Sequence, residues 1–249
     1  MTAPQQVAAA IKQEILEGGL CPGDKLPSEE ELAGLFGVSR PTARAGLQAL
    51  CASHVLVVQR GRGGGYRVSD FSLTNLGAHV GDFISLSLVV DQLTPEQFLE
   101  VRYAHEVLCA EAAAERRTNS DLDALDAISD AIAGSALSSR DAFELDLTFH
   151  RALADASHNP LIVGFEGAMI AGLHRLLDDG DSVDPTDSLG NVGEIIHAVR
   201  DRDPNLAGHA MRCHLEHSVT HYRRSGVTAT PVKVDERRDG VPTVPETMA

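Results

Sequence analysis

The sequence predicts a mainly α-helical protein, with an N-terminal domain of three helices and a small β-hairpin followed by an all-α helical bundle. Three observations lead to this prediction. Residues 1–70 show helical apolar spacing and then two β-branched segments around a glycine-rich tip. Residues 71–224 repeat helical patterns separated by short polar turns. Residues 225–249 are proline-rich and lack a periodic apolar face, so we expect a disordered tail there.

The first two helices of the N-terminal domain are marked by apolar spacing and by a capping motif. Residues 7–17 place apolar side chains at helical intervals, and two glycines, which commonly end helices, follow them. Ser28 precedes a second helix and has Glu31 three residues later, the arrangement of a capping box. The buried side of this second helix is predicted to hold Leu32, Leu35 and Phe36.

The third helix follows a tight turn at Gly37. Ser39 is a favourable N-cap, and Pro41 falls in the first turn, where a missing N–H is tolerated. The inward face is predicted to hold Ala43, Leu47 and Leu50. The segments "HVLVVQ" and "YRV" are typical of two strands on either side of the tip "RGRGGG". Helix, helix, turn, helix and hairpin in this order predict a winged helix-turn-helix domain.

A basic segment lies within an acidic chain. The formal net charge is −15, yet residues 1–70 hold seven basic and seven acidic residues, so the acidic excess lies after residue 70. Between Gly37 and Val68 the charged residues are all arginines, namely Arg40, Arg44, Arg60, Arg62 and Arg67. Because basic side chains that neutralise phosphate supply most non-specific DNA affinity, this segment predicts contact with double-stranded DNA.

The arginines have specific places in a winged helix. Arg40 and Arg44 are one turn apart on the third helix, where their side chains can grip guanine or clamp phosphate, and Thr42 between them can reach a phosphate or a base edge. In the hairpin tip the glycines let the backbone approach the duplex, while Arg60 and Arg62 can enter the minor groove. An arginine pair alone is more often a solvated face, and a glycine run alone is a flexible loop. Their combination in this order favours DNA binding.

This region resembles the N-terminal signature of the GntR family of transcriptional regulators. The resemblance lies in "LPSEEELAGLFGVSRPTARAGLQAL" followed by "VVQRGRGGGYRV", over roughly residues 5–70. It implies that DNA is contacted by Arg40, Thr42 and Arg44 of the recognition helix and by Arg60 and Gly61 of the wing.

Two residues depart from the family pattern. Glu30 stands where members usually carry an arginine, and its carboxylate would repel phosphate. Gly46 replaces a better helix former, at a cost of about 1 kcal/mol. We therefore expect operator affinity or sequence preference to differ from that of typical members.

The second domain is predicted to be helical throughout. One helix, from 95 to 117, has Thr94 as N-cap, Pro95 at its first position and Gln97 at the capping-box position. The full set of predicted helices is 73–90, 95–117, 120–134, 139–156, 160–178, 188–201 and 204–224.

One constellation in this domain suggests metal binding. Asp146 and His150 are four residues apart and therefore share a helix face, and a facing helix carries His214, with His217 and His221 on nearly the same side. Such a set is enough to hold a divalent transition metal in a helical bundle. The alternative is an ordinary polar pair, which is the commoner fate of Asp-x-x-x-His.

Residues 73–224 resemble the FCD ligand-binding domain of the FadR subgroup, in which an Asp and three His commonly bind a metal beside the effector. Asp146, His150 and His214 match three of these positions, but Val192 occupies the fourth. His197, five residues further on, lies roughly 140° round the helix and does not replace it. The site could hold Zn, Ni or Mn with water or a ligand oxygen filling in, recruit His217 or Asn191, or hold no metal.

Arg102 is the candidate effector-binding residue. It shares a helix face with Phe98, Cys109 and Ala113, so its guanidinium should point into the bundle and needs an anionic partner. Glu106, one turn on, is the internal candidate. The functional alternative is the carboxylate of a small organic acid, which the matching arginine of FCD relatives grips.

The four cysteines, Cys21, Cys51, Cys109 and Cys213, show no CxxC spacing, and we expect ordinary buried thiols. No apolar run approaches the length of a membrane span, and the N-terminus lacks the features of a signal peptide, so a cytoplasmic location is expected.

The sequence thus predicts a homodimeric, ligand-responsive repressor that binds a near-palindromic operator and is not an enzyme. Two alternatives remain open. One is a metal-dependent hydrolase, against which stands the lack of a nucleophile or general base with an orienting partner. The other is a metal-free regulator that senses an acyl thioester.

Overall fold

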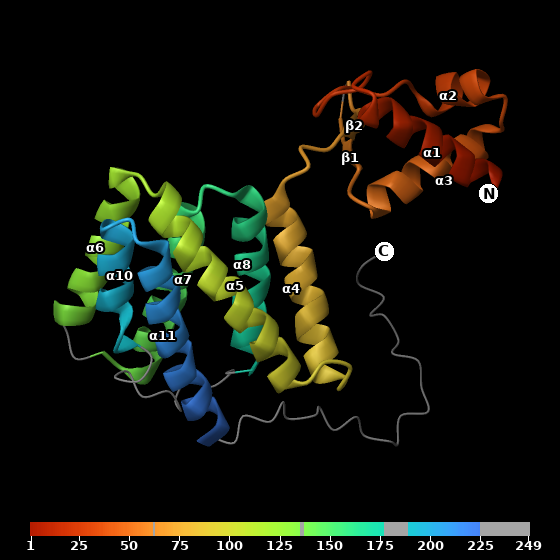
Figure 1. Ribbon diagram of the computed structural model, residues 1–249. Helices are drawn as coiled ribbons and strands as arrows, with labels where there is room; N and C mark the ends of the chain where they lie inside the picture. The colour runs from red at the N-terminus through yellow and green to blue at the C-terminus, as the bar shows by residue number, and fades with distance from the viewer. Residues whose placement is uncertain (62, 135–136, 177–188, 225–249) are drawn as a thin grey trace, which may run out of the picture. The chain divides into compact units, whose positions relative to one another are not determined.

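The computed structural model describes residues 1–61, 63–134, 137–176 and 189–224, with the backbone alone for residues 74–76 and 217–224. The described chain is mostly helical and carries one two-stranded antiparallel sheet, as predicted (Figure 1). It divides into two compact units, Met1–Ser72 and the chain from Leu73 onward. The predicted disordered tail, residues 225–249, lies outside the described residues.

The first unit has the element order of a winged helix-turn-helix. Three helices are followed by a hairpin, with bounds α1 Ala3–Leu16, α2 Glu29–Phe36, α3 Arg40–Ala52, β1 Leu56–Gln59 and β2 Gly65–Val68. The strands pair from Leu56 opposite Val68 to Gln59 opposite Gly65. A single apolar core joins α1, α2, α3 and the hairpin, and it contains the predicted inward residues Ala43, Leu47 and Leu50.

The helix ends follow local sequence signals. The capping box at α2 is confirmed, because Glu31 N donates to Ser28 Oγ while Ser28 N donates to Glu31 Oε2. Ser39 caps α3 by accepting from Thr42 N, and Gly37 between the two helices has φ 63°, which favours glycine.

The predicted buried face of α2 is partly wrong. Leu32 is buried as expected, but Leu35 is 73% exposed and Phe36 is 37% exposed. Ala33 joins Leu32 in the core instead. The buried arc is therefore centred between residues 32 and 33, which leaves Leu35 about 110° away from the centre at 100° per residue. Phe36 is the last residue of α2, and its side chain is only partly covered by the rest of the unit.

Gly46 has a structural role that helix propensity does not reveal. It is buried in α3 where α1 crosses, and a Cβ there would lie 2.9 Å from the Pro4 carbonyl oxygen and 3.0 Å from Val7 Cγ1. The absence of a side chain therefore lets the two helices approach.

Replacing Gly46 with alanine is expected to destabilise the first unit by about 1–3 kcal/mol, because overpacking at the crossing outweighs the propensity gain of about 1 kcal/mol. Urea unfolding measured by circular dichroism checks this result. Gly34→Ala in α2 is the matched control, since a Cβ there meets nothing within 4 Å. A Gly46→Ala protein as stable as wild type would contradict the role assigned to the crossing.

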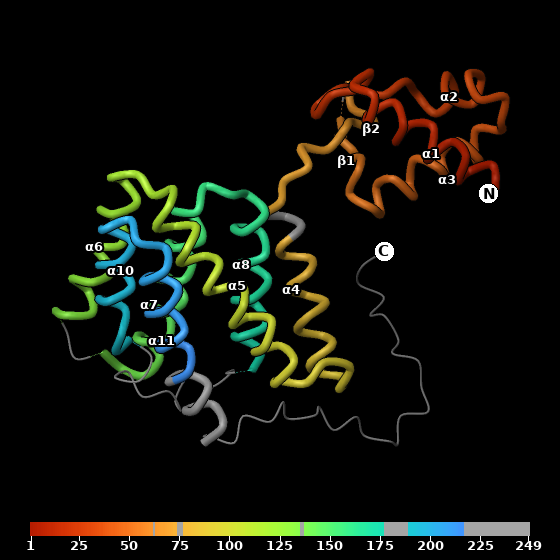
Figure 2. Tube along the Cα trace, viewed as in Figure 1, coloured from red at the N-terminus to blue at the C-terminus, as the bar shows by residue number. Residues whose placement is uncertain are grey.

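The second unit is a bundle in which α5 contacts α7, α8, α10 and α11, while α4 packs along α8 (Figures 1 and 2). The helices are α4 Leu73–Val89, α5 Pro95–Arg116, α6 Asn119–Gly134, α7 Ser139–Ala156, α8 Pro160–Leu176, α10 Val192–Arg200 and α11 Pro204–Arg224. The predicted helices match these within a few residues, and the capping box at Thr94 is confirmed. The predicted end of the helix 160–178 and start of the helix 188–201 fall partly in residues 177–188, outside the described chain.

Small residues bring α4 and α8 together. A Cβ on Gly77 would collide with the Gly164 carbonyl oxygen, and a Cβ on Gly164 would lie 2.5 Å from the Leu73 carbonyl oxygen. A second apolar core forms where α4 and α8 meet α5 and α7. The larger core lies among α5, α6, α7, α10 and α11.

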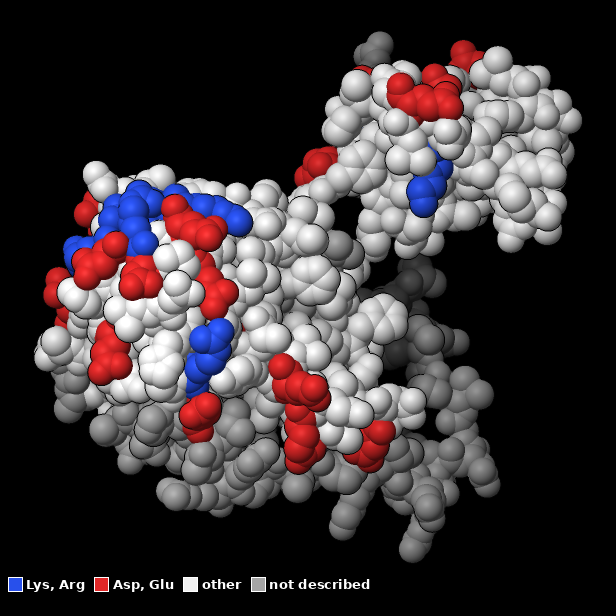
Figure 3. Space-filling model, in the orientation of Figure 1, with Lys and Arg blue, Asp and Glu red and all other residues white. Residues whose placement is uncertain are grey.

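Basic side chains gather at the end of the second unit where α5 finishes (Figure 3). Arg117 donates to the Arg200 carbonyl at 2.6 Å, and Arg202 donates to the carbonyls of Glu115 and Arg117 at 2.9 and 2.8 Å. Cations at helix C-termini satisfy carbonyls that lack helical partners and complement the helix dipole. Arg117 and Arg202 therefore have a structural explanation within the bundle.

Candidate functional site

Helix α3 presents both predicted arginines outward. The side chains of Arg40 and Arg44 are 62% and 55% exposed, and Thr42 between them is half-buried, with its hydroxyl 2.8 Å from Ser39 Oγ. An arginine pair on an exposed face of α3 has the reach that a major-groove reader needs.

Glu29 of α2 forms ion pairs with both arginines. Arg44 Nε donates to Glu29 Oε1 at 2.8 Å, and Arg40 Nε donates to Glu29 Oε2 at 3.3 Å. Tyr66 of the wing also donates its hydroxyl to Glu29 Oε1 at 3.3 Å. The hydrogen bond from Arg44, helped by the one from Arg40, lowers the pKa of Glu29 against the opposing effect of burial. The acid that meets the arginines is thus Glu29 and not its neighbour Glu30, the departure from the family pattern.

The wing is exposed at its tip. Arg60 and Gly61 are exposed, Gly61 has φ 104°, and Arg62 lies outside the described residues. Arg67, by contrast, donates to Gln59 Oε1 and the Gly23 carbonyl and so supports the hairpin. A groove of about 400 Å³ runs between the wing, α3 and the start of α2.

The predicted metal ligands meet in the core of the second unit. Asp146 and His150 lie on α7 and His214 on α11, and each is at most 1% exposed. The two Nε2 atoms are 3.3 Å apart, and Asp146 Oδ1 lies 3.3 Å from the His214 Nε2 and 3.7 Å from the His150 Nε2. Three donor atoms from two helices therefore converge on one point.

These separations fit a transition metal. Ligand atoms about 2.0–2.1 Å from a tetrahedral zinc ion lie roughly 3.3–3.4 Å from one another. Asp146 Oδ1 is buried and makes no hydrogen bond, and its contacts are the Nε2 atoms of the two histidines, so a cation among the three atoms would give this oxygen a strong partner. Asp146, His150 and His214 thus fit a divalent metal both in donor type and in spacing.

Glu106 and Arg102 of α5 complete the buried cluster. His150 Nδ1 lies 2.7 Å from Glu106 Oε2, and Arg102 Nε donates to Glu106 Oε1 at 3.3 Å. The Arg102 Nη2 atom is also 3.3 Å from His150 Nε2. A carboxylate that accepts from the far nitrogen of a metal-ligating histidine is the usual orienting partner of such a ligand.

The charges in this cluster shift the pKa values of its members. Burial alone would raise the pKa of Glu106, but His150 and Arg102 outweigh it and hold the pKa at about 2. Burial opposes protonation of His150, while Glu106 and Asp146 outweigh it and raise the His150 pKa. Because a metal needs the lone pair of Nε2, metal binding competes with that proton.

Comparisons with known proteins agree with this architecture. Residues 3–65 match the family of bacterial regulatory proteins named gntR, and residues 97–217 match the FCD domain. The Uxu operon transcriptional regulator of Escherichia coli K12 is 31% identical over 85% of this chain and 83% of its own. The chain belongs to the GntR family.

Two further relatives support this assignment. LutR of Bacillus subtilis, an HTH-type transcriptional regulator, is 37% identical over 59% of this GntR chain, and the match spans 65% of LutR. The solved structure of Streptococcus agalactiae GntR has a TM-score of 0.57 at 28% identity, covering 89% of this chain and 99% of its own. A GntR-family chain with an FCD domain is a regulator rather than an enzyme, so the hydrolase alternative falls.

No described helix of this GntR protein is long and apolar enough to cross a membrane.

The fourth metal-ligand position of this GntR protein is apolar. Val192, at the start of α10, is buried in the larger core. The side chain of His197 is 68% exposed and pairs with Asp201 at 3.2 Å, as expected of a residue on another face of the helix. Asn191 is the N-cap of α10, and the side chain of His217 lies outside the described residues. Among the described His, Cys, Asp and Glu residues, no fourth joins the group.

The structure confirms the internal partner predicted for Arg102, and effector binding by Arg102 stays a prediction. Arg102 is buried and pairs with Glu106, the internal partner. It also reaches His150 Nε2, one of the predicted metal-ligating atoms. The sequence predicts Glu106 as a partner of Arg102. It does not predict the contact between Glu106 and His150, because these two residues are 44 positions apart.

Proposed function

We propose that this protein is a cytoplasmic repressor of the FadR subgroup that binds operator DNA as a homodimer and responds to a small organic acid. The observation that carries the proposal is the convergence of Asp146, His150 and His214 beside the guanidinium of Arg102. A carboxylate effector has one oxygen for a metal and another for an arginine. Both recognition groups lie within one buried cluster.

DNA binding is assigned to the exposed residues of α3 and the wing. The proposed contacts are Arg40, Thr42, Arg44, Arg60, Gly61 and Arg62. In the absence of DNA, Glu29 neutralises part of the charge of Arg40 and Arg44. A phosphate or guanine must compete with Glu29 for these guanidiniums, so operator binding replaces an internal ion pair with an external contact.

Effector binding is assigned to the second unit. Asp146, His150 and His214 would hold Zn, Ni or Mn, which supplies a Lewis-acidic centre for a carboxylate oxygen. Arg102 would give up part of its hydrogen bonding to Glu106 and His150 and donate those N–H groups to the effector instead. Glu106 would remain the partner of His150 Nδ1 and keep the imidazole oriented.

Homodimer formation is supported by apolar residues on the surface of α4 and just after it. Phe83, Leu86 and Val90 are exposed at helical spacing. An exposed apolar stripe of this kind marks an interaction surface, and a second copy of the chain would cover it. A dimer presents two recognition helices to the two halves of a near-palindromic operator.

The regulation requires differential binding. An effector that binds the DNA-competent arrangement less well than the other shifts the population away from the operator, with a coupling of about 1–3 kcal/mol. Occupancy of an operator is by itself enough to block transcription, which favours repression over activation.

Val192 favours a second candidate, a metal-free regulator whose effector is an acyl thioester. With an apolar residue at the fourth position, a metal would have three protein ligands, Asp146, His150 and His214, instead of four. The missing ligand is the reason to consider a metal-free protein. The metal content of the protein separates the two candidates.

Metal analysis and one arginine variant test the proposal. Protein purified without chelator is expected to contain zinc, nickel or manganese by elemental mass spectrometry, and His214→Ala is expected to lower the content by one equivalent per chain. Arg102→Ala should keep the metal and still bind operator, yet lose the release of DNA caused by carboxylate effectors, as followed by fluorescence anisotropy. A metal content unchanged in His214→Ala, or a normal effector response in Arg102→Ala, would contradict the assignment.

A further inference from the structure

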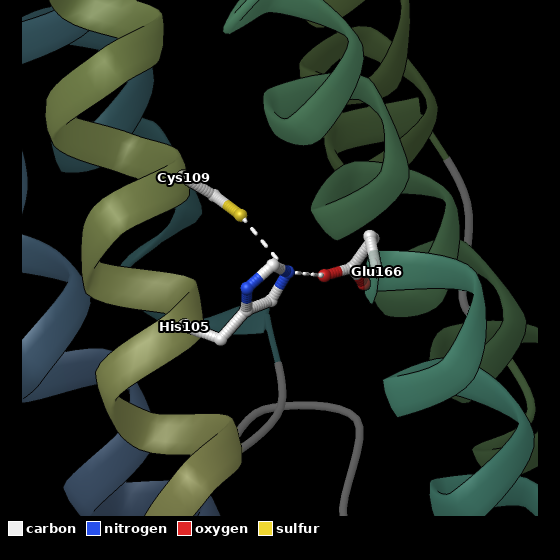
Figure 4. A group of neighbouring side chains, drawn as sticks. All are labelled: His105, Cys109 and Glu166. Carbon is white, nitrogen blue, oxygen red and sulfur yellow. Dashed lines mark hydrogen bonds and ion pairs between the residues drawn. The ribbon is translucent and has the colours of Figure 1, made fainter. Parts of the chain in front are cut away.

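A second group of metal-binding side chains lies between α5 and α8. His105 and Cys109 are one turn apart on α5, and Glu166 faces them from α8 (Figure 4). The three ligand atoms all lie within 4.8 Å of one another. None of these side chains belongs to the group of Asp146, His150 and His214, which lies between α7 and α11.

The burial of Glu166 is the feature that requires an explanation. Its side chain is 1% exposed, and neither carboxylate oxygen makes a hydrogen bond. His105 Nε2 lies at ion-pair distance, 3.3 Å from Oε2. Burial raises the pKa of Glu166, and the charge of nearby Glu106 raises it further. A buried carboxylate with so little compensation is costly unless it takes up a proton or a cation pairs with it.

Cys109 is the one cysteine that fits the expectation of a buried thiol. Of the four predicted buried thiols, Cys21 is exposed and Cys51 and Cys213 are half-buried, so the prediction holds for Cys109 alone. Its Sγ lies 3.5 Å from His105 Nε2 (Figure 4). Burial raises the pKa of the Cys109 thiol, so the thiol stays protonated unless a metal displaces the proton.

The geometry excludes a nucleophile–base–acid relay. In such a relay the histidine uses one ring nitrogen for the nucleophile and the other for the carboxylate. Here the same atom, His105 Nε2, faces both Cys109 Sγ and Glu166 Oε2. One nitrogen, one sulfur and one oxygen that lie within 4.8 Å of one another are a set of donors that an ion could bind together.

Two of the three ligand separations match zinc coordination, and the third, between Cys109 Sγ and the Glu166 carboxylate, is within 4.8 Å. Zinc binds sulfur at about 2.3 Å and nitrogen or oxygen at about 2.0–2.1 Å, so tetrahedral ligands lie roughly 3.5 Å apart for nitrogen and sulfur and roughly 3.3 Å for nitrogen and oxygen. The observed pairs are 3.5 and 3.3 Å. The side chain of His105 is 12% exposed, which leaves an approach for the ion and for a water as fourth ligand.

We propose that His105, Cys109 and Glu166 form a second divalent-metal site, selective for zinc-like ions that accept sulfur, nitrogen and oxygen ligands together. Binding replaces the Cys109 thiol proton with the metal and releases that proton to solvent. The site shares no ligand with the proposed effector centre.

Cobalt titration of the metal-free, full-length protein tests the proposal. A thiolate bound to Co²⁺ gives a sulfur-to-metal charge-transfer band in the near ultraviolet, and the effector centre has no sulfur ligand. We expect this band in wild type and in His214→Ala. In His214→Ala, which lacks one ligand of the effector centre, it should saturate at one equivalent of cobalt per chain. Cys109→Ser should lose the band, and Glu166→Gln should weaken cobalt binding about tenfold or more.

Cys213→Ser is the matched control, because Cys213 also follows a histidine by one helical turn and lies 3.9 Å from His209 Nε2. It should keep the band, and circular dichroism shows whether each variant is folded. Absence of the band in wild type at saturating cobalt overturns the proposal. Its persistence in Cys109→Ser, or wild-type cobalt affinity in Glu166→Gln, would overturn it as well. The band does not require His214. The cobalt result therefore tests the second site even if the proposed effector centre binds no metal.

Discussion

Arg44→Ala is expected to weaken operator binding by about 1–3 kcal/mol, or roughly 5- to 150-fold, while leaving oligomeric state and fold intact. The guanidinium is more than half exposed on α3, where its removal creates no cavity. Truncation also frees one Glu29 oxygen from its closest arginine, so a negative charge then faces the phosphates. Both effects act in the same direction.

Fluorescence anisotropy with a duplex selected by the wild-type protein from random sequences measures this loss. If Arg44 contacts phosphate, the salt dependence should fall by about one counterion per half-site, whereas a base contact should relax specificity at one position. Arg140→Ala is the control, because it removes the same charge from an exposed position at the start of α7. Equal affinities for Arg44→Ala and Arg140→Ala would refute the assignment of α3 as the recognition helix.

Local interactions were predictable from the sequence because they connect residues three or four positions apart. The capping boxes at Ser28 and Thr94 are of this kind, and so is the Arg102–Glu106 pair. The shared face of Asp146 and His150 likewise follows from helical geometry. The helix order of both units followed from the same short-range periodicity.

Interactions between helices could not be predicted in this way. Glu29 meets Arg44 across 15 positions, and Glu106 meets His150 across 44, because the packing angle of two helices decides which faces touch. Leu35 shows the same limit, since the amphipathic pattern allowed two positions for the buried arc of a short helix. The exposure of Leu35 and the burial of Glu106 are both consequences of tertiary packing.

Glu106→Gln is expected to destabilise the metal-free protein by roughly 3 kcal/mol at about pH 7, since a carboxyl pKa lowered from 4.5 to about 2 in the folded state corresponds to that free energy. The amide would leave Arg102 and His150 buried without their shared anion. Removing one member of a buried ionic cluster costs more than the pair contributes, because the remaining charges stay desolvated.

The pH dependence identifies the source of this loss. The folded-state pKa of Glu106 is lower than the unfolded one, so its contribution is complete above about pH 4.5 and is lost as the pH falls toward about 2. The difference between Glu106→Gln and wild type should therefore be smaller at about pH 3.5 than at about pH 7 in urea unfolding. Glu111→Gln on the same helix is the control, because its half-exposed pair with Arg212 should contribute less than about 1 kcal/mol. A pH-independent difference, or a Glu106→Gln protein as stable as Glu111→Gln, would show that the buried cluster is not held by the charge of Glu106.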